Sequence, residues 1–123
     1  MAFAEPQFEL SEEDLDERTH LIAIAGEIHV STATRFSALL DDAIGRGKTA
    51  VVLDLSAVEF IDSTGLSVLL NGLRLVTRQR GHMALVCTNP TVLRLFEITR
   101  LDATFDIHAD RESALSAVRA AED

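Results

Sequence analysis

The chain has 123 residues, of which 47% are hydrophobic, so it is long enough for one domain with a packed core and too short for two. Its net charge of −9 and its aromatic content of 5% argue against nucleic acid or an anionic membrane surface as a direct partner. One cysteine allows no internal disulfide, and no leader-like segment or membrane-length apolar run occurs, so we expect a cytoplasmic protein with one domain over residues 1–123.

The first part of the chain predicts an edge strand followed by an inner strand. Residues 7–11 alternate weakly between apolar and polar side chains, and the charged run 12–18 is typical of a solvated turn. The apolar run 20–25 predicts a second strand that ends at Gly26. The short polar link between the two strands favours an antiparallel pair.

An amphipathic helix is predicted next. Ser31 or Thr32 can cap its start, and Gly45 and Gly47 can end it. Its apolar side chains recur at helical spacing and lie on one face: Ala33, Phe36, Leu40, Ala43 and Ile44.

A strand and a longer helix follow. The run 50–55 is apolar except at Asp54, which is typical of a central strand covered on both faces. A helix is predicted over about 63–79, with an apolar face made of Leu66, Leu69, Leu70, Leu73 and Val76. Residues 82–87 predict the next strand, in which we expect Cys87 to be a buried, unreactive thiol.

The last third predicts a short helix around 92–96, a short strand at 105–107 and a final helix capped by Asp110. The order of elements is therefore β-β-α-β-α-β-α-β-α. Strands and helices that alternate in this way predict an α/β fold, with a mixed, mostly parallel β-sheet and helices packed against it.

Two segments share part of an enzyme motif. Residues 45–49, GRGKT, look like the end of a phosphate-binding loop, but Asp42 replaces the glycine that the pattern requires, and the segment precedes a strand. Ser63 lacks one of the two flanking glycines of a hydrolase nucleophile elbow, because Ile61 stands at that position. The four histidines have no metal-ligand spacing. We therefore expect no catalytic residues, no cofactor and no metal, and a small enzyme built around Asp62 is the weakest alternative.

The segment Asp62-Ser63-Thr64-Gly65 joins the central strand to the long helix. On local chemistry alone, an ordinary helix cap is the favoured interpretation, because Asp and Ser side chains often accept hydrogen bonds from the free amides of a first helical turn.

Residues 58–66, VEFIDSTGL, resemble the signature of the bacterial anti-sigma factor antagonists, small proteins of the STAS domain class. Similar matches occur at 25–28, 53–55, 95–101 and 105–107. The resemblance extends from about residue 7 to 119, which would be the core of a single STAS-like domain.

This resemblance implies that Ser63 is phosphorylated by an anti-sigma factor that is also a serine kinase. Asp62, Ser63, Thr64, Gly65 and Leu66 would form the partner-binding surface. The unphosphorylated protein would bind the anti-sigma factor and free sigma, and the phosphorylated protein would not bind. A phosphatase is a further expected partner, and whether Thr64 is a second acceptor stays open.

Three residues depart from the family pattern: His29 replaces an acidic or polar residue, Ser67 replaces a glycine, and Arg100 stands where a small residue is common. These changes leave Ser63 intact but bear on the identity of the partner. The alternative is a STAS subunit of a signalling scaffold, or of a lipid or anion transporter complex, that acts as a permanent docking module.

Overall fold

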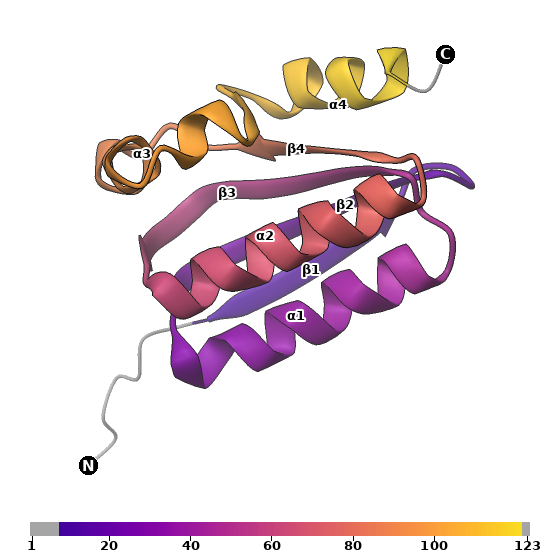
Figure 1. Ribbon diagram of the computed structural model, residues 1–123. Helices are drawn as coiled ribbons and strands as arrows, with labels where there is room; N and C mark the ends of the chain where they lie inside the picture. The colour runs from indigo at the N-terminus through magenta and orange to yellow at the C-terminus, as the bar shows by residue number, and fades with distance from the viewer. Residues whose placement is uncertain (1–7, 122–123) are drawn as a thin grey trace.

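Strands and helices alternate along the chain in the computed structural model, which describes residues 8–121 (Figure 1). The elements are β1 (Glu9–Asp14), β2 (Thr19–Ile28), α1 (Val30–Gly45), β3 (Ala50–Ile61), α2 (Ser63–Arg78), β4 (His82–Val86), α3 (Pro90–Ile98), the 3₁₀ turn η1 (Leu101–Ala103), β5 (Asp106–His108) and α4 (Arg111–Ala120). The predicted order of strands and α-helices is confirmed.

The five strands form one mixed sheet in the order β1-β2-β3-β4-β5. β1 runs antiparallel to β2, and the other neighbouring pairs are parallel. The mostly parallel sheet predicted from the alternation of elements is therefore confirmed. Because the parallel strands end at one edge of the sheet, the loops that follow β2 and β3 lie side by side.

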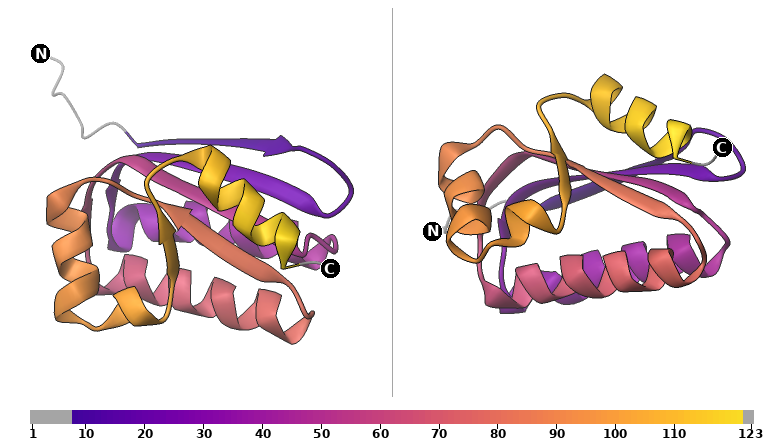
Figure 2. Two further views of the ribbon diagram at one scale, coloured as in Figure 1. Left: turned by 90° about the horizontal axis from the view of Figure 1, so that it is seen from above. Right: turned by 45° about the horizontal axis from the view of Figure 1, so that its top comes forward.

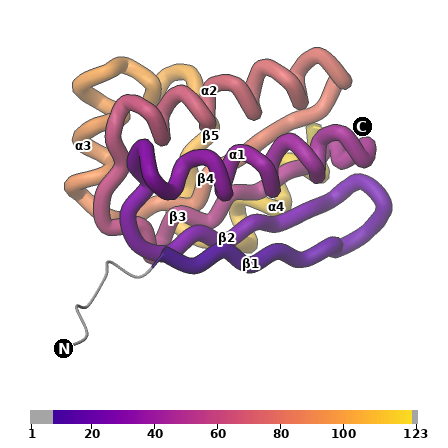
Figure 3. Tube along the Cα trace, turned by 90° about the horizontal axis from the view of Figure 1, so that it is seen from below, coloured from indigo at the N-terminus to yellow at the C-terminus, as the bar shows by residue number. Residues whose placement is uncertain are grey.

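Helices cover the two faces of the sheet unequally. α1 and α2 lie next to each other across one face (Figure 3), and α4 lies on the opposite face (Figure 1). In β3 the side chains alternate, so that Val51, Leu53 and Leu55 join the large core under α1 and α2, whereas Ala50 and Val52 join a smaller core under α4. α3 packs on β3 at the end of the sheet where α2 begins (Figure 2).

The first hairpin differs from its prediction. β1 covers Glu9–Asp14 and not residues 7–11; Gln7 lies outside the described residues. The prediction of a turn over 12–18 is wrong for its first three residues, which pair with β2. The physical reason is His20, which is buried on β2 and places its ring nitrogens 2.5 Å from Asp14 Oδ1 and 2.8 Å from Glu12 Oε2. Polar partners across the hairpin therefore keep this charged segment extended.

Two strands are longer than predicted. β2 continues through Gly26, whose φ of 103° is a conformation that favours glycine, and ends at Ile28. β3 continues past Leu55 to Ile61, although β4 pairs with it only as far as Asp54. The added lengths of β2 and β3 pair with each other and extend beyond the rest of the parallel sheet.

The start of α1 also differs from its prediction. His29 is the N-cap, and its Nδ1 accepts a hydrogen bond from the backbone N–H of Ser31 at 3.2 Å. Thr32 completes a capping box, because its Oγ1 accepts from the backbone N–H of His29 at 3.0 Å. The predicted caps Ser31 and Thr32 are therefore the second and third residues of the helix.

Candidate functional site

The first turn of α2 is built as a regular helix start. Asp62 is the N-cap, and its Oδ1 accepts a hydrogen bond from the backbone N–H of Gly65 at 3.0 Å. The cap expected from local chemistry is therefore present. Ser63 is the first residue of the helix and is exposed to solvent. The same turn therefore contains both the cap, Asp62, and an exposed hydroxyl group, that of Ser63.

This turn is held tightly against the ends of β2 and β3. The backbone N–H of Asp62 donates to the carbonyl of Ile28 at 3.1 Å. A Cβ placed on Gly65 would lie 2.6 Å from Ile61 Cγ1, 2.8 Å from Ile28 Cγ2 and 3.1 Å from the Ile28 carbonyl oxygen. Gly65 is therefore required for the close approach of α2 to the sheet.

The five predicted partner-binding residues differ in exposure. Ser63 is exposed, Asp62 and Thr64 are half-buried, and Gly65 and Leu66 are buried. Ser63, Asp62 and Thr64 can meet a partner directly. Gly65 and Leu66 instead fix the position of the turn, because their contacts are with the core of the protein.

Two of the residues that depart from the family pattern belong to this edge of the sheet. His29 caps α1 directly after Ile28, and Ser67 donates its hydroxyl hydrogen bond to the carbonyl of Ser63 at 2.9 Å. Ser67 is exposed one turn further along α2. The Ser67 hydroxyl therefore contacts the backbone of Ser63, and this hydrogen bond does not involve the Ser63 hydroxyl.

Two exposed apolar side chains lie near the ends of the segments that meet at this edge of the sheet, and the sequence pattern did not predict their exposure. Val30, two residues after Ile28, is 71% exposed, and Phe60, three residues before Ser63, is 46% exposed. The sequence signal that could have indicated the exposure of Phe60 is the alternation of side chains in β3 beyond Leu55. Because that strand was predicted to end at Leu55, Phe60 could not be assigned to a face.

A small apolar pocket lies beside Phe60, between the end of β3 and α3. Its lining consists of Phe60, Ile61, Thr91, Val92 and Leu95. Asn89 joins the two walls, because its Nδ2 donates to the carbonyl of Val58 at 3.1 Å while its side-chain oxygen caps α3. α3 therefore borders a pocket at the end of β3, the strand that leads into Ser63.

Other candidate residues lie away from this edge. The segment 45–49 ends α1 and leads into β3, as the prediction of a turn requires. Cys87 is buried, and burial is the main cause that raises the pKa of its thiol. Within residues 8–121, no group of three or more His, Cys, Asp and Glu side chains is placed to hold a metal ion.

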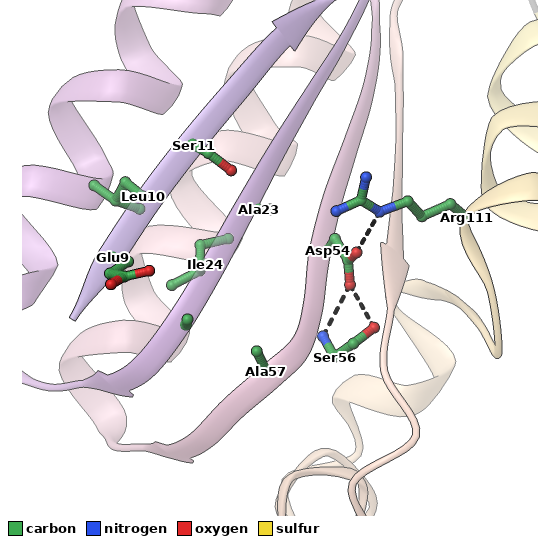
Figure 4. Close-up of a pocket in the computed structure, with 10 residues that line it drawn as sticks. Glu9, Leu10, Ser11, Ala23, Ile24, Asp54, Ser56, Ala57 and Arg111 are labelled. Carbon is green, nitrogen blue, oxygen red and sulfur yellow. Dashed lines mark hydrogen bonds and ion pairs between the residues drawn. The ribbon is translucent and has the colours of Figure 1, made fainter. Parts of the chain in front are cut away.

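A second pocket opens on the face of the sheet that carries α4 (Figure 4). Asp54 forms part of it and accepts hydrogen bonds from the backbone N–H of Ser56 at 2.9 Å and from Arg111 Nε at 2.5 Å. Burial acts to raise the pKa of Asp54, but the hydrogen bonds from Ser56 and Arg111 outweigh it and lower the pKa. Since Arg111 is the first residue of α4, this contact joins α4 to the sheet.

Comparisons with known proteins give consistent matches. The family model described as STAS domain matches residues 13–114. The anti-sigma F factor antagonist of Paenibacillus polymyxa is 31% identical over 97 residues, which cover 78% of this chain and 83% of the relative. The anti-sigma-F factor antagonist RsfB of Mycobacterium tuberculosis is 31% identical over 99 residues, which cover 80% of each chain.

Solved structures share the fold. An anti-sigma factor antagonist from Mycobacterium paratuberculosis matches with a TM-score of 0.83 at 31% identity, covering 92% of this chain and 95% of that one. The anti-sigma factor antagonist SpoIIAA in its unphosphorylated form matches with a TM-score of 0.78 at 25% identity, covering 93% and 97%. The phosphorylated form of the Bacillus SpoIIAA matches with a TM-score of 0.70 at 25% identity, covering 91% and 99%. Among the described residues, no helix has the length and apolar character needed to cross a membrane.

Proposed function

The chain belongs to the STAS domain family, and on that premise we propose that it is an anti-sigma factor antagonist switched at Ser63. Without phosphate it binds an anti-sigma factor that is also a serine kinase, and sigma is released. Phosphate on Ser63 ends this binding. The main support is the exposed Ser63 at the start of α2, with the exposed apolar side chains of Val30 and Phe60 at the same edge of the sheet.

The fold should tolerate phosphate at this position. A phosphoserine carries about −1.5 to −2 charges at neutral pH. At the first position of α2 that charge meets the positive end of the helix dipole, although the carboxylate of the neighbouring Asp62 opposes part of the gain. The similarity to SpoIIAA in both its unphosphorylated and phosphorylated forms supports a switch without a change of fold.

The partner experiences the phosphate differently. A partner that covers Val30 and Phe60 excludes water from the surface around Ser63. A phosphate dianion in this interface would lose its hydration, which costs free energy, or would prevent the partner from approaching closely. A loss of about 3 kcal/mol would weaken binding by more than a hundredfold. The switch is therefore electrostatic and steric and acts at the interface.

In this proposal the chain is a substrate and supplies no catalysis of its own. The kinase provides the general base, the magnesium ion and ATP, and a phosphatase later removes the phosphate from Ser63. The Ser63 side chain needs only to be accessible. The partners also imply a cytoplasmic location, because sigma factors act on RNA polymerase there.

Affinity capture from the native cell tests the proposal. Wild type should retain an anti-sigma factor kinase, and Ser63→Asp should lose it. With that kinase and ATP, mass spectrometry should find one phosphate on wild type and none on Ser63→Ala, which should stay folded. A Thr64→Ala variant run in parallel shows whether Thr64 accepts a second phosphate. Phosphate found elsewhere and never on Ser63 would overturn the assignment.

The docking-module alternative gives a different result in the same experiment. Transporter or scaffold subunits would then co-purify with wild type. Their capture would be unchanged by Ser63→Ala and Ser63→Asp, because a permanent docking site does not depend on the charge of one residue.

A further inference from the structure

Basic residues are concentrated in one part of this acidic protein. Between Ser63 and Arg100, which includes α2, β4 and α3, the chain has five arginines and a single acid, Glu97, for a net charge of +4. The rest of the chain holds six of the 11 Lys and Arg residues against 19 of the 20 Asp and Glu residues. The sequence is therefore basic in this segment and strongly acidic outside it.

The cations outside this segment have partners. Arg46 Nε lies 3.0 Å from Asp42, Lys48 Nζ lies 3.3 Å from Asp14, Arg111 pairs with Asp54, and Arg119 lies 3.6 Å from Asp16. The guanidinium of Arg35 lies 5.3 Å from the centre of the Phe8 ring.

The arginines inside the segment behave differently. Each of them is exposed, and within residues 8–121 their side chains make no ion pair, hydrogen bond or ring contact: Arg74, Arg78, Arg80, Arg94 and Arg100. These five arginines are therefore positive charges that no nearby carboxylate neutralises, on a chain that is rich in carboxylates.

Two of these arginines lie on the same stripe of α2 as Ser63. At 100° per residue, the exposed residues of this stripe fall within an arc of about 80°: Ser63, Ser67, Asn71, Arg74 and Arg78. The buried residues Leu69, Gly72 and Val76 face the core instead. The stripe runs for about 22 Å along the helix, at a rise of about 1.5 Å per residue.

We propose that Arg74 and Arg78 form a second docking point for the protein that recognises Ser63, and that they meet an acidic surface of that partner. This inference rests on the proposed function. A partner that covers the start of α2 can continue along its exposed stripe, where the two unpaired guanidinium groups offer complementary charge. The same charges accelerate the encounter of an acidic partner with a protein whose net charge is otherwise strongly negative.

The docking point acts independently of the switch. Arg74 is 11 residues from Ser63, or about 16 Å along the helix, which exceeds the screening length of about 8 Å at physiological salt. A phosphate on Ser63 therefore leaves the attraction at Arg74 and Arg78 nearly unchanged. Removing the arginines should lower the affinity of both phosphorylation states by a similar factor.

The test measures the association rate constant with the kinase that phosphorylates Ser63, over a range of NaCl concentrations. The double variant Arg74→Ala/Arg78→Ala is compared with Arg46→Ala/Arg119→Ala, which removes the same charge from exposed arginines that already have acidic partners. At low salt the first variant should associate about tenfold more slowly than wild type, and the control should stay within about twofold. The difference should disappear at about 1 M salt, where screening is nearly complete.

Two results would overturn this inference and leave the proposed function standing. The first is equal association of the two double variants with a kinase that still phosphorylates Ser63. The second is salt-dependent self-association of wild type that the Arg74→Ala/Arg78→Ala variant loses, because the arginines would then contact a second copy of the chain. If wild type neither binds nor accepts phosphate from any captured kinase, the proposed function fails and this inference fails with it.

Discussion

At the residue scale, the turn from β3 into α2 depends on Gly65, because there is no room for a side chain at this position. The sequence predicts that Asp62 or Ser63 caps the helix, and Asp62 does so. The reason for Gly65 was not predictable, because its contact with Ile28 joins residues that are far apart in the chain. A sequence motif shows that a glycine is present, but only the packing shows which neighbour requires it.

Gly65→Ala should destabilise the protein by about 1–3 kcal/mol, because the added methyl overlaps Ile28 and Ile61 in a closely packed region. Gly45→Ala is the matched control, since a Cβ at Gly45 meets nothing within 4 Å at the end of α1. That control should be neutral or slightly stabilising, by up to about 1 kcal/mol. Urea unfolding of both variants checks the prediction, and equal stability of the two variants would contradict it.

Arg100 is a second residue whose backbone explains a feature of the sequence. It stands where the related family commonly has a small residue, and its φ of 62° and ψ of 18° are left-handed. Residues other than Gly, Asn and Asp rarely adopt this backbone conformation. The departure from the family pattern therefore carries a conformational cost at the end of α3.

Arg100→Gly should raise the free energy of unfolding by about 0.5–1 kcal/mol, because glycine adopts the left-handed conformation without strain. Arg94→Gly is the control, since Arg94 is an exposed arginine inside α3 and glycine there should cost about 1 kcal/mol. Thermal or urea unfolding distinguishes the two, and a loss of stability in both would refute the explanation.

At the element scale, the added lengths of β2 and β3 place the candidate site. Periodicity predicts the existence and order of the strands, but it ends β3 at Leu55, one residue after Asp54, which is the last residue of β3 that pairs with β4. The continuation to Ile61 is held by pairing with β2, and several residues of this part of β3 are exposed. An apolar pattern therefore does not reveal it. The exposure of Phe60 therefore depends on this continuation of β3 and does not follow from the apolar pattern.

The attachment of α4 is another element-scale feature that pattern reasoning missed. Asp54 interrupts an apolar strand, and its partner Arg111 is 57 residues later. A lone acid in a buried strand indicates that a partner exists but does not identify it. The contact between Asp54 and Arg111 holds the first turn of α4 on the sheet.

Arg111→Gln should lower the free energy of unfolding at pH 7 by about 1–2 kcal/mol, since it removes a charged hydrogen bond to a buried carboxylate. The pKa of Asp54 is lowered in the folded protein, so the stabilisation is present above the unfolded pKa of about 4 and is lost as the pH falls through the folded pKa. Unfolding measured at several pH values should show the difference from wild type shrinking below about pH 4. Arg119→Gln should cost less than about 1 kcal/mol at any pH, because its pair with Asp16 is exposed. A pH-independent difference for Arg111→Gln would contradict this explanation.

At the scale of the whole molecule, the acidic net charge conceals a basic region on α2 and α3. Composition gives the net charge of −9, which argues against nucleic acid as a partner. It does not show which cations are already neutralised by nearby carboxylates. The ion pairs of Arg46, Lys48, Arg111 and Arg119 leave the arginines between Ser63 and Arg100 as the available positive charge.

The fold as a whole should be indifferent to charge at Ser63. Ser63 is exposed, and the first turn of α2 is fixed by Asp62, Gly65 and Leu66 below it. The free energy of unfolding of Ser63→Asp should therefore lie within about 0.5 kcal/mol of the wild-type value, as is usual for a surface substitution. Any difference should be a small increase, because the helix dipole favours a negative charge at this position. A large loss of stability in urea unfolding would indicate that the switch alters the fold itself.

The central claim is that one phosphate on Ser63 abolishes binding at a surface that otherwise stays the same. Titration calorimetry with the captured anti-sigma factor, using the unphosphorylated protein and the protein phosphorylated on Ser63, tests it most directly. The account predicts a loss of affinity of more than about a hundredfold on phosphorylation, equivalent to about 3 kcal/mol. Equal affinity of the two forms for the anti-sigma factor would contradict it.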